Sequence, residues 1–288
     1  MRLRPFALLL VLIVGAACAG AGAPDGGGVK VVATTTILAD LAKNVGGDRV
    51  SVSSIAPAGA EIEEYSPKPE DARKVSEAAV ILVNGLDLDT WSEDLLKNKK
   101  PSAVVIVLTE GLPAIDENPH MWFDVELTRA YVAKIRDALI QADPAGKDVV
   151  TAAHLKYDNE LVRLHGEMRR KAAEVPAAKR KLVTSHDAFP YFAKAYGFEV
   201  VGFVQPEADK EPSAAELGAL VEKVKNAGVP AIFVESQASP KLSEALAKEA
   251  GVKRIVTDIP TDSLQDQPAD TYVGLMRTVM ERIVTALK

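Results

Sequence analysis

Short runs of apolar residues alternate with segments of helical periodicity along most of this chain. Residues 29–33 (VKVVA) form the first run, residues 37–45 have helical spacing, and residues 50–55 alternate as the next strand. Short apolar runs indicate strands, and apolar positions that recur about every three or four residues indicate helices. Strands that alternate with helices predict parallel sheets covered by helices. Further predicted strands are residues 80–84, 104–108, 182–184, 200–206, 231–235 and 254–257, and further predicted helices are residues 70–79, 91–97, 127–141, 189–196 and 270–287.

The second half of the chain repeats the first. Residues 32–46 (VATTTILADLAKNVG) align without gaps with residues 183–197 (VTSHDAFPYFAKAYG), and the strands that follow correspond in order. In this alignment Thr35 stands where His186 lies. We therefore expect an α/β fold of two pseudo-repeated lobes, each a small parallel sheet flanked by helices. Their strand-end loops would face each other across a cleft, where ligands prefer to bind.

A long helical segment separates the two halves. From residue 145 to about residue 173 the pattern stays helical, which predicts one rigid helix between the lobes. The expected division is an N-terminal lobe over residues 29–143, a linking helix over 144–176 and a C-terminal lobe over 177–288. His154 and His165 lie on this helix, too far apart to share a metal ion, so we expect ordinary exposed histidines.

The first residues have the pattern of a signal peptide. A short basic region precedes an apolar stretch too short to span a bilayer, and small residues then lead to Cys18, the only cysteine. Cys18 stands where bacterial lipoproteins carry a lipid-modified cysteine. We expect a signal peptide over residues 1–17, a flexible tether over 18–28, and an exported chain, periplasmic or at the cell surface, anchored by lipid. Gly15, where such signals usually carry leucine, leaves ordinary cleavage near Ala17 as an alternative.

The composition narrows the range of ligands. The chain has 288 residues, 48% of them hydrophobic, and its net charge of −6 comes without any long basic run. We therefore expect a globular protein that binds no nucleic acid. Aromatic residues make up only 5%, which argues against a sugar receptor, and no ammonium or carboxylate clamp is evident for an amino acid.

Four strand-end loops, two in each predicted lobe, carry groups that could bind a metal ion. They supply Glu63, His120, His186 and one of the acids Asp258 and Asp262. Each residue alone has an ordinary alternative, as a surface acid, a turn residue or a packed histidine. Together, imidazole nitrogen and carboxylate oxygen suit a divalent first-row transition ion, and the lack of sulfur gives no reason to expect copper(I) or an iron–sulfur centre.

Five motifs are spread over nearly the whole chain behind the predicted tether: residues 59–71 (GAEIEEYSPKPED), 84–86 (NGL), 118–125 (NPHMWFDV), 185–197 (SHDAFPYFAKAYG) and 261–272. Together they resemble the metal-binding subunits of bacterial zinc and manganese ABC transporters, the family that includes adhesin-type lipoproteins. The resemblance implies two lobes joined by one backbone helix, with His120 and His186 as metal ligands. It also favours Asp262 over Asp258 as the acid of the C-terminal lobe.

One position departs from the family pattern. The family commonly has histidine where this chain has Glu63, and Glu61 or Glu64 could replace Glu63 after a small loop shift. The loop between residues 108 and 119 is also short and lacks the His-rich insertion of many zinc-specific relatives. Both observations favour Mn²⁺, whereas the general order of metal affinities favours Zn²⁺, so the choice stays open.

The function that the resemblance implies is capture rather than catalysis. A monomeric protein would bind one Mn²⁺ or Zn²⁺ ion and deliver it to a membrane permease, with only modest tilting of the lobes. Asp187 or Glu235 would orient the imidazoles. The alternatives are a metal-dependent hydrolase, which four protein ligands disfavour because they leave no position for water, and a metal-stabilised adhesin lipoprotein with a role in cell adhesion.

Overall fold

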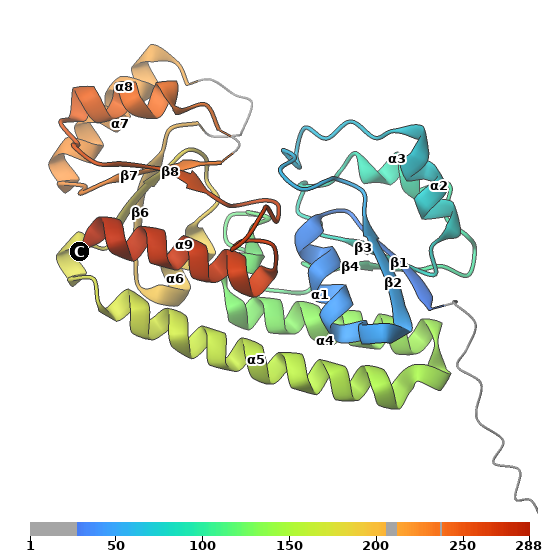
Figure 1. Ribbon diagram of the computed structural model, residues 1–288. Helices are drawn as coiled ribbons and strands as arrows, with labels where there is room; N and C mark the ends of the chain where they lie inside the picture. The colour runs from blue at the N-terminus through green and yellow to red at the C-terminus, as the bar shows by residue number, and fades with distance from the viewer. Residues whose placement is uncertain (1–27, 206–211, 237) are drawn as a thin grey trace, which may run out of the picture.

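Two α/β lobes lie side by side along one long helix, α5 (Lys147–Ala173), in the computed structural model of the chain (Figure 1). The structure describes residues 28–205, 212–236 and 238–288. This arrangement confirms the predicted fold class. The expected signal peptide, the tether up to residue 27 and Cys18 lie outside the described residues.

The N-terminal lobe is built on a parallel sheet of four strands in the order β2-β1-β3-β4. The inner strand β3 is buried over its whole length because helices cover both faces of the sheet. All four strand ends that point toward the other lobe are carboxyl ends, since the strands are parallel. The strands are β1 (Val29–Ala33), β2 (Val50–Ser54), β3 (Val80–Val83) and β4 (Val104–Val107).

The helices of this lobe begin and end at sequence signals that can be recognised. Thr35 caps α1, because its hydroxyl oxygen accepts from the backbone N–H of Leu38 at 3.2 Å. The helix ends at Gly47, whose φ of +54° favours glycine. Proline opens α2, where its missing N–H costs nothing. The helices are α1 (Thr36–Gly46), α2 (Pro69–Glu77) and α3 (Ser92–Leu96), and short 3-10 turns cover Gly47–Arg49 and Met121–Phe123. Two further 3-10 turns, Pro144–Gly146 and Ala177–Lys179, lie near the two ends of α5.

Two antiparallel helices, α4 (Val125–Ala142) and α5, connect the lobes. At 27 residues α5 is about 40 Å long, enough to run beneath both lobes. It begins at Lys147, two residues later than the periodicity predicted, because residues 144–146 form a 3-10 turn. Its apolar stripe faces α1, α4 and the last helix, α9 (Tyr272–Leu287), so the expected rigid connection is a helix packed against its neighbours.

The expectation of an exposed His154 was wrong. This side chain is only 7% exposed, because position 154 falls on the same buried stripe of α5 as Val150, Tyr157 and Leu161. Neither of its ring nitrogens has a hydrogen-bond partner among the described residues. Burial, together with the charge of Arg136, lowers the pKa of His154, so it is a neutral core residue.

The C-terminal lobe differs from its counterpart in one respect. Its strands form two parallel pairs, β5–β6 and β7–β8, instead of one continuous hydrogen-bonded sheet. Both pairs contain a register shift, beside Val183 in the first and between Phe233 and Glu235 in the second. The strands are β5 (Lys181–Thr184), β6 (Glu199–Phe203), β7 (Ile232–Glu235) and β8 (Ile255–Ile259), and the helices are α6 (Pro190–Tyr196), α7 (Ala214–Ala227), α8 (Pro240–Ala250) and α9 (Tyr272–Leu287).

Aromatic side chains join the lobes around a common core. Phe123, which precedes α4, stacks on Phe189 at the start of α6, with ring centroids 4.7 Å apart. Both rings are buried, and their core cluster contains residues of both lobes, of α5 and of α9. Within the described residues, no helix combines the length and the apolarity needed to cross a membrane.

Candidate metal centre

His120 is held by the loop between β4 and α4. Its backbone N–H donates to Asn118 Oδ1 at 3.0 Å, and its ring Nδ1 lies 3.0 Å from the same oxygen. The Pro119 carbonyl between them accepts from Asn84 Nδ2 at 3.1 Å. Because Asn118 Oδ1 is an acceptor, it fixes the proton of the neutral ring on Nδ1. The free nitrogen, Nε2, is therefore the one that can bind a metal ion.

His186 follows β5, where the strand gives way to the short segment before α6. Its backbone N–H donates to Glu235 Oε1 at 3.1 Å, and its ring Nδ1 contacts Glu235 Oε2. Ser185 Oγ in turn accepts from the backbone N–H of Glu235 at 3.1 Å. Of the two partners that we considered from the sequence, Glu235 orients this imidazole, whereas Asp187 lines the cavity beside it.

Asp262 lies beyond the end of β8 and is only 4% exposed. Its Oδ2 accepts from Thr261 Oγ1 at 3.3 Å, but its buried Oδ1 accepts no well-oriented hydrogen bond from the described residues. A buried carboxylate oxygen of this kind needs a cationic partner. Asp258, the alternative, is exposed on β8 with a φ of +64° and does not belong to the cluster.

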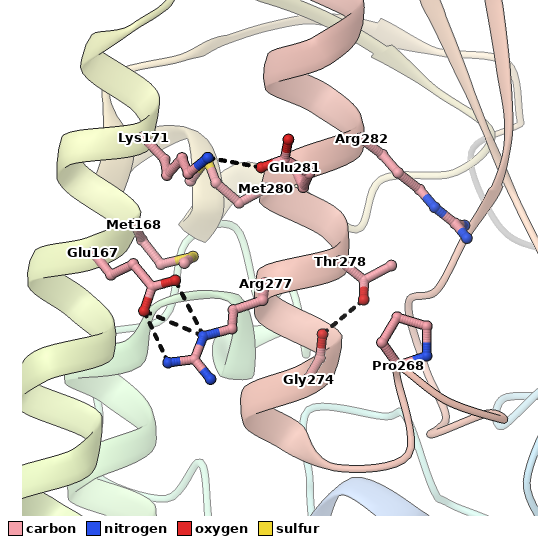
Figure 2. A pocket seen from close by; sticks show the side chains of 10 residues that line it. All are labelled: Glu167, Met168, Lys171, Pro268, Gly274, Arg277, Thr278, Met280, Glu281 and Arg282. Carbon is pink, nitrogen blue, oxygen red and sulfur yellow. Dashed lines mark hydrogen bonds and ion pairs between the residues drawn. The ribbon is translucent and has the colours of Figure 1, made fainter.

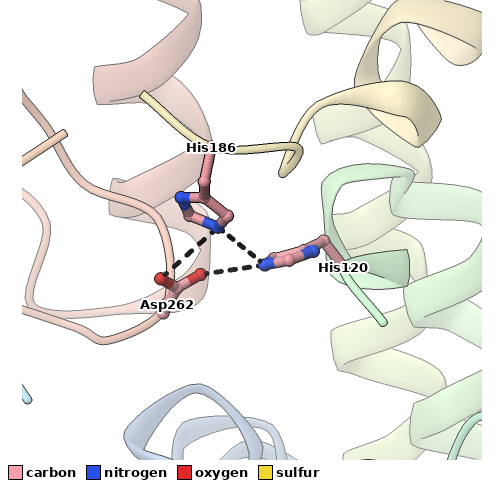
Figure 3. Close-up of side chains that lie close together, drawn as sticks. All are labelled: His120, His186 and Asp262. Atoms are coloured by element: carbon pink, nitrogen blue, oxygen red, sulfur yellow. Dashed lines mark hydrogen bonds and ion pairs between the residues drawn. The ribbon is translucent and has the colours of Figure 1, made fainter. Parts of the chain in front are cut away.

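The three side chains converge on one point between the lobes (Figure 3). The two Nε2 atoms are 3.1 Å apart, and Asp262 lies 3.3 Å from His120 Nε2 through Oδ1 and 3.9 Å from His186 Nε2 through Oδ2. Nitrogens that bind one tetrahedral ion at about 2.0–2.1 Å are about 3.3 Å apart. The spacing therefore fits a single transition-metal ion with little rearrangement.

Acidic side chains surround the approach to this cluster. A cavity of about 530 Å³ reaches both imidazoles, and none of the residues lining it is a lysine or arginine. A negative cavity raises the local concentration of cations. Its acidic residues are Glu63, Glu64, Asp87, Asp116, Glu117 and Asp187.

The charges of the cluster favour a proton on His186 before any metal binds. Burial opposes the imidazolium, but the charges of Glu235 and Asp262 outweigh it and raise the pKa of His186 to about 10. Burial also opposes the ionised Asp262, yet the nearby charge of His186 holds the pKa of Asp262 below its ordinary value. A divalent ion must therefore displace a proton from this site.

Glu63 stands apart from the three converging residues. It is exposed and lines the cavity, and the described metal-binding group contains only His120, His186 and Asp262. Glu61 is half-buried on the same loop, and burial together with the charge of Asp262 raises its pKa to about 7. The assignment of Glu63 as the fourth ligand thus stays a prediction, with Glu61 as its nearest rival.

A second cavity, of about 640 Å³, lies between α5 and α9 and shares no lining residue with the first (Figure 2). Two of its three cationic side chains are paired: Arg277 forms an ion pair with Glu167 at 2.9 Å, and Lys171 forms one with Glu281 at 2.9 Å. The lining contains no histidine or cysteine, so this cavity offers nothing comparable to the His–His–Asp cluster.

Asn118 is a candidate positioning residue that the sequence analysis did not single out. Its Oδ1 orients His120, its Nδ2 donates to the backbone carbonyl of Asp187, and its own carbonyl accepts from Tyr191 Oη at 2.7 Å. It therefore links the loops of the two lobes beside the metal centre. The available signal was its place two residues before His120, since asparagine side chains often bond to the backbone two residues on.

A buried His–His–Asp cluster between two α/β lobes on a rigid helix defines a two-lobed metal-binding protein. Comparison with known proteins shows to which family of metal-binding proteins the chain belongs. Residues 31–286 match the family described as "Zinc-uptake complex component A periplasmic". The chain belongs to this family, whose members are substrate-binding transport proteins and not enzymes.

Relatives extend over almost the full chain. The manganese-binding lipoprotein MntA of Halalkalibacterium halodurans is 32% identical over 98% of this chain and 97% of its own length. The manganese ABC transporter substrate-binding lipoprotein PsaA of Streptococcus mitis is 33% identical over 98% of this chain and 97% of its own.

Solved structures share the fold. The periplasmic zinc-binding protein TroA from Treponema pallidum superimposes with a TM-score of 0.83 and 32% identity, covering 91% of this chain and 99% of that one. The Mn-bound periplasmic metal-binding protein from Candidatus Liberibacter asiaticus gives a TM-score of 0.82 at 26% identity, with coverage of 90% and 99%.

Proposed function

We propose that this protein captures one Mn²⁺ or Zn²⁺ ion outside the cytoplasm and delivers it to the permease of an ABC transporter. The observation that carries this proposal is the buried cluster of His120, His186 and Asp262, whose donor atoms lie within 4.8 Å of one another. The family consists of metal-uptake components, and the named relatives bind manganese or zinc. The protein's partners are thus the metal ion as cargo and the permease as receiver.

The ligands that we propose are His120, His186, Asp262 and, as the fourth, Glu63. The first three support the assignment by their spacing and by the unpartnered oxygen of Asp262. Glu63 is included because it lies on the wall of the same cavity and its charge contributes to the raised pKa of His186. Two imidazoles and two carboxylates suit either Mn²⁺ or Zn²⁺.

We also propose the cellular form of the protein. The relatives are named as lipoproteins, and the sequence around Cys18 supports removal of residues 1–17 and lipid attachment at Cys18. The mature chain would act as a monomer, with lobes at residues 29–143 and 177–288 joined by residues 144–176. The lipid would keep the protein close to its permease.

Two other functions have less support. A hydrolase would need an open metal position and a general base, and the family is one of transport proteins. An adhesin role would leave metal uptake unaffected by loss of the protein.

Metal uptake in cells tests the proposal directly. We expect deletion of the gene in its native bacterium to lower the uptake of radiolabelled Mn²⁺ or Zn²⁺ under metal limitation. The wild-type gene should restore uptake, and the His186→Ala variant at equal abundance should not. Unchanged uptake of both metals in the deletion strain would refute the transport function.

A further inference from the structure

The segment that carries Asp262 belongs to the C-terminal lobe in sequence but is bound by the N-terminal lobe. After β8 ends at Ile259, the chain crosses toward α1 before α9 begins (Figure 1). The backbone N–H of Leu264 donates to Thr36 Oγ1 at 2.8 Å, at the first residue of α1. At the far end of the segment, the backbone N–H of Tyr272 donates to Asp40 Oδ2 at 3.0 Å.

Two further hydrogen bonds lie immediately on either side of Asp262. The carbonyl of Thr261 accepts from Trp122 Nε1 at 3.1 Å, and Trp122 comes two residues after His120. Ser263 Oγ accepts from the backbone N–H of Gly59 at 2.9 Å. The residues before and after the carboxylate, Thr261 and Ser263, are both fully buried, so water cannot easily replace either bond.

The hydrogen bond from Gly59 also connects the Asp262 segment to the loop that contains Glu61 and Glu63. Gly59 begins the loop that contains Glu61 and Glu63, and its φ of +75° is a conformation that favours glycine. Ser263 therefore connects the loop of the proposed fourth ligand to the residue next to Asp262. The same loop is fixed further on, where Trp91 Nε1 donates to the carbonyl of Ile62 at 2.8 Å.

Metal binding is sensitive to such connections. Distances between ligands and the ion in zinc sites vary by only about 0.2 Å. A carboxylate that moves further than this from the two imidazoles can no longer bind the same ion. Asp262 lies 3.3 Å from His120 Nε2 and 3.9 Å from His186 Nε2, and no hydrogen bond from a described residue holds its Oδ1 in place. The position of this carboxylate therefore depends on the backbone of its segment.

We propose that Thr36 and Ser263 are positioning residues of the metal centre, which fasten the Asp262 segment to the N-terminal lobe and to the Glu63 loop. This inference rests on the proposed function. The carboxylates of Asp262 and Glu63 then approach or leave the imidazoles together, because one serine hydroxyl connects their loops.

Removal of the two hydroxyl groups tests this role. Ser263→Ala and Thr36→Val should each weaken the binding of Zn²⁺ and Mn²⁺ about 10- to 100-fold, the range found when groups behind metal ligands are lost. Thr36→Ser, which keeps the hydroxyl, should bind like the wild type. Chelator competition measures the affinities, and the absorption spectrum of the Co²⁺-loaded protein should change in Ser263→Ala and Thr36→Val because the coordination geometry changes.

Thr278→Val is the matched control. Thr278 Oγ1 donates to the Gly274 carbonyl at 2.8 Å within α9, so this variant also loses a hydroxyl bond but leaves the metal centre intact. Its affinity and Co²⁺ spectrum should equal those of the wild type. The positioning role is refuted if Ser263→Ala and Thr36→Val, shown to be folded by circular dichroism, keep wild-type affinity and spectrum. Failure of the wild type itself to bind any of the three metals would instead refute the proposed function.

Discussion

The two lobes present the same atom, an imidazole Nε2, to the same point, but they orient it with different partners. The N-terminal lobe uses the neutral carboxamide of Asn118 for His120, and the C-terminal lobe uses the carboxylate of Glu235 for His186. Both partners fix Nδ1 and leave Nε2 free for the metal ion that we propose. Only the charged partner also stabilises an imidazolium, so the C-terminal lobe supplies the proton that a metal ion must displace.

Replacement of His186 should have the largest effect. His186→Thr copies the residue that stands at Thr35 in the first lobe, where the same framework folds without histidine. We expect a folded protein whose metal affinity falls by more than the roughly 100-fold expected for an outer partner. Isothermal titration with Zn²⁺ and Mn²⁺ measures this loss. Tight binding by His186→Thr would show that the C-terminal lobe contributes no essential ligand.

Exchange of the groups that orient the two imidazoles, Asn118 and Glu235, should have the next largest effect on metal binding. Glu235→Gln keeps an acceptor but removes the charge, which makes the second lobe resemble the first. We expect the affinity of the deprotonated site to fall about 10- to 100-fold, a loss that is seen in full only above about pH 10. At lower pH the difference shrinks, because the wild-type imidazole must first lose a proton whose pKa is about 10.

Proton release distinguishes this account from a simple loss of stability. Titration of Zn²⁺ in buffers of different ionisation enthalpy should show fewer protons released per ion by Glu235→Gln than by the wild type at pH 8. The reverse exchange, Asn118→Asp, should increase the number released. Equal proton release by all three proteins would contradict the charge difference between the lobes.

The stability of the metal-free protein should depend on pH through the same residue. The pKa of His186 is raised from about 6.5 in the unfolded chain to about 10 in the folded protein. Its proton therefore stabilises the fold fully below about pH 6.5, and this contribution is lost as the pH rises through about 10. A loss of about 1 kcal/mol lowers the Tm of a chain of this size by about 2–4 °C. Thermal unfolding between pH 7 and pH 10 should show a smaller fall for Glu235→Gln, and an equal fall would contradict the assignment.

The two acids of the 59–64 loop should have the smallest effects. If Glu63 is the fourth ligand, Glu63→Gln should weaken metal binding by about 10-fold or more. Glu61→Gln should mainly change how metal binding depends on pH near 7. Chelator competition at pH 6 and pH 8 compares the two variants. Unchanged affinity in Glu63→Gln, with a clear loss in Glu61→Gln, would transfer the ligand role to Glu61.

The sequence was sufficient for the parts of this protein that depend on local patterns. Apolar periodicity predicted the strands and most of the helices to within a few residues, because each of these elements buries its own stripe or run. It did not predict α7 or α8 of the C-terminal lobe. The repeat of residues 32–46 at residues 183–197 predicted two similar lobes. His120 and His186 stood out because each follows a strand end within a long family motif, and the structure brings both together with Asp262.

Contacts between segments that are far apart in the chain could not be predicted from the sequence. Thr36 and Leu264 are 228 positions apart, and nothing in either local pattern pairs them. Apolar runs also do not encode the register shifts within the β5–β6 and β7–β8 pairs. His154 was misjudged because a polar residue on a buried helical stripe looks the same in sequence as one at its edge.

The central claim is that the two lobes bind one metal ion between His120 and His186. The most direct measurement is elemental analysis of the purified wild type and of a His120→Ala/His186→Thr double variant, followed by competition between Zn²⁺ and Mn²⁺. We predict one ion per wild-type chain, competition of both metals for the same site, and no tightly bound ion in the double variant. A wild type without a bound metal ion, or a double variant that retains one, would contradict the account.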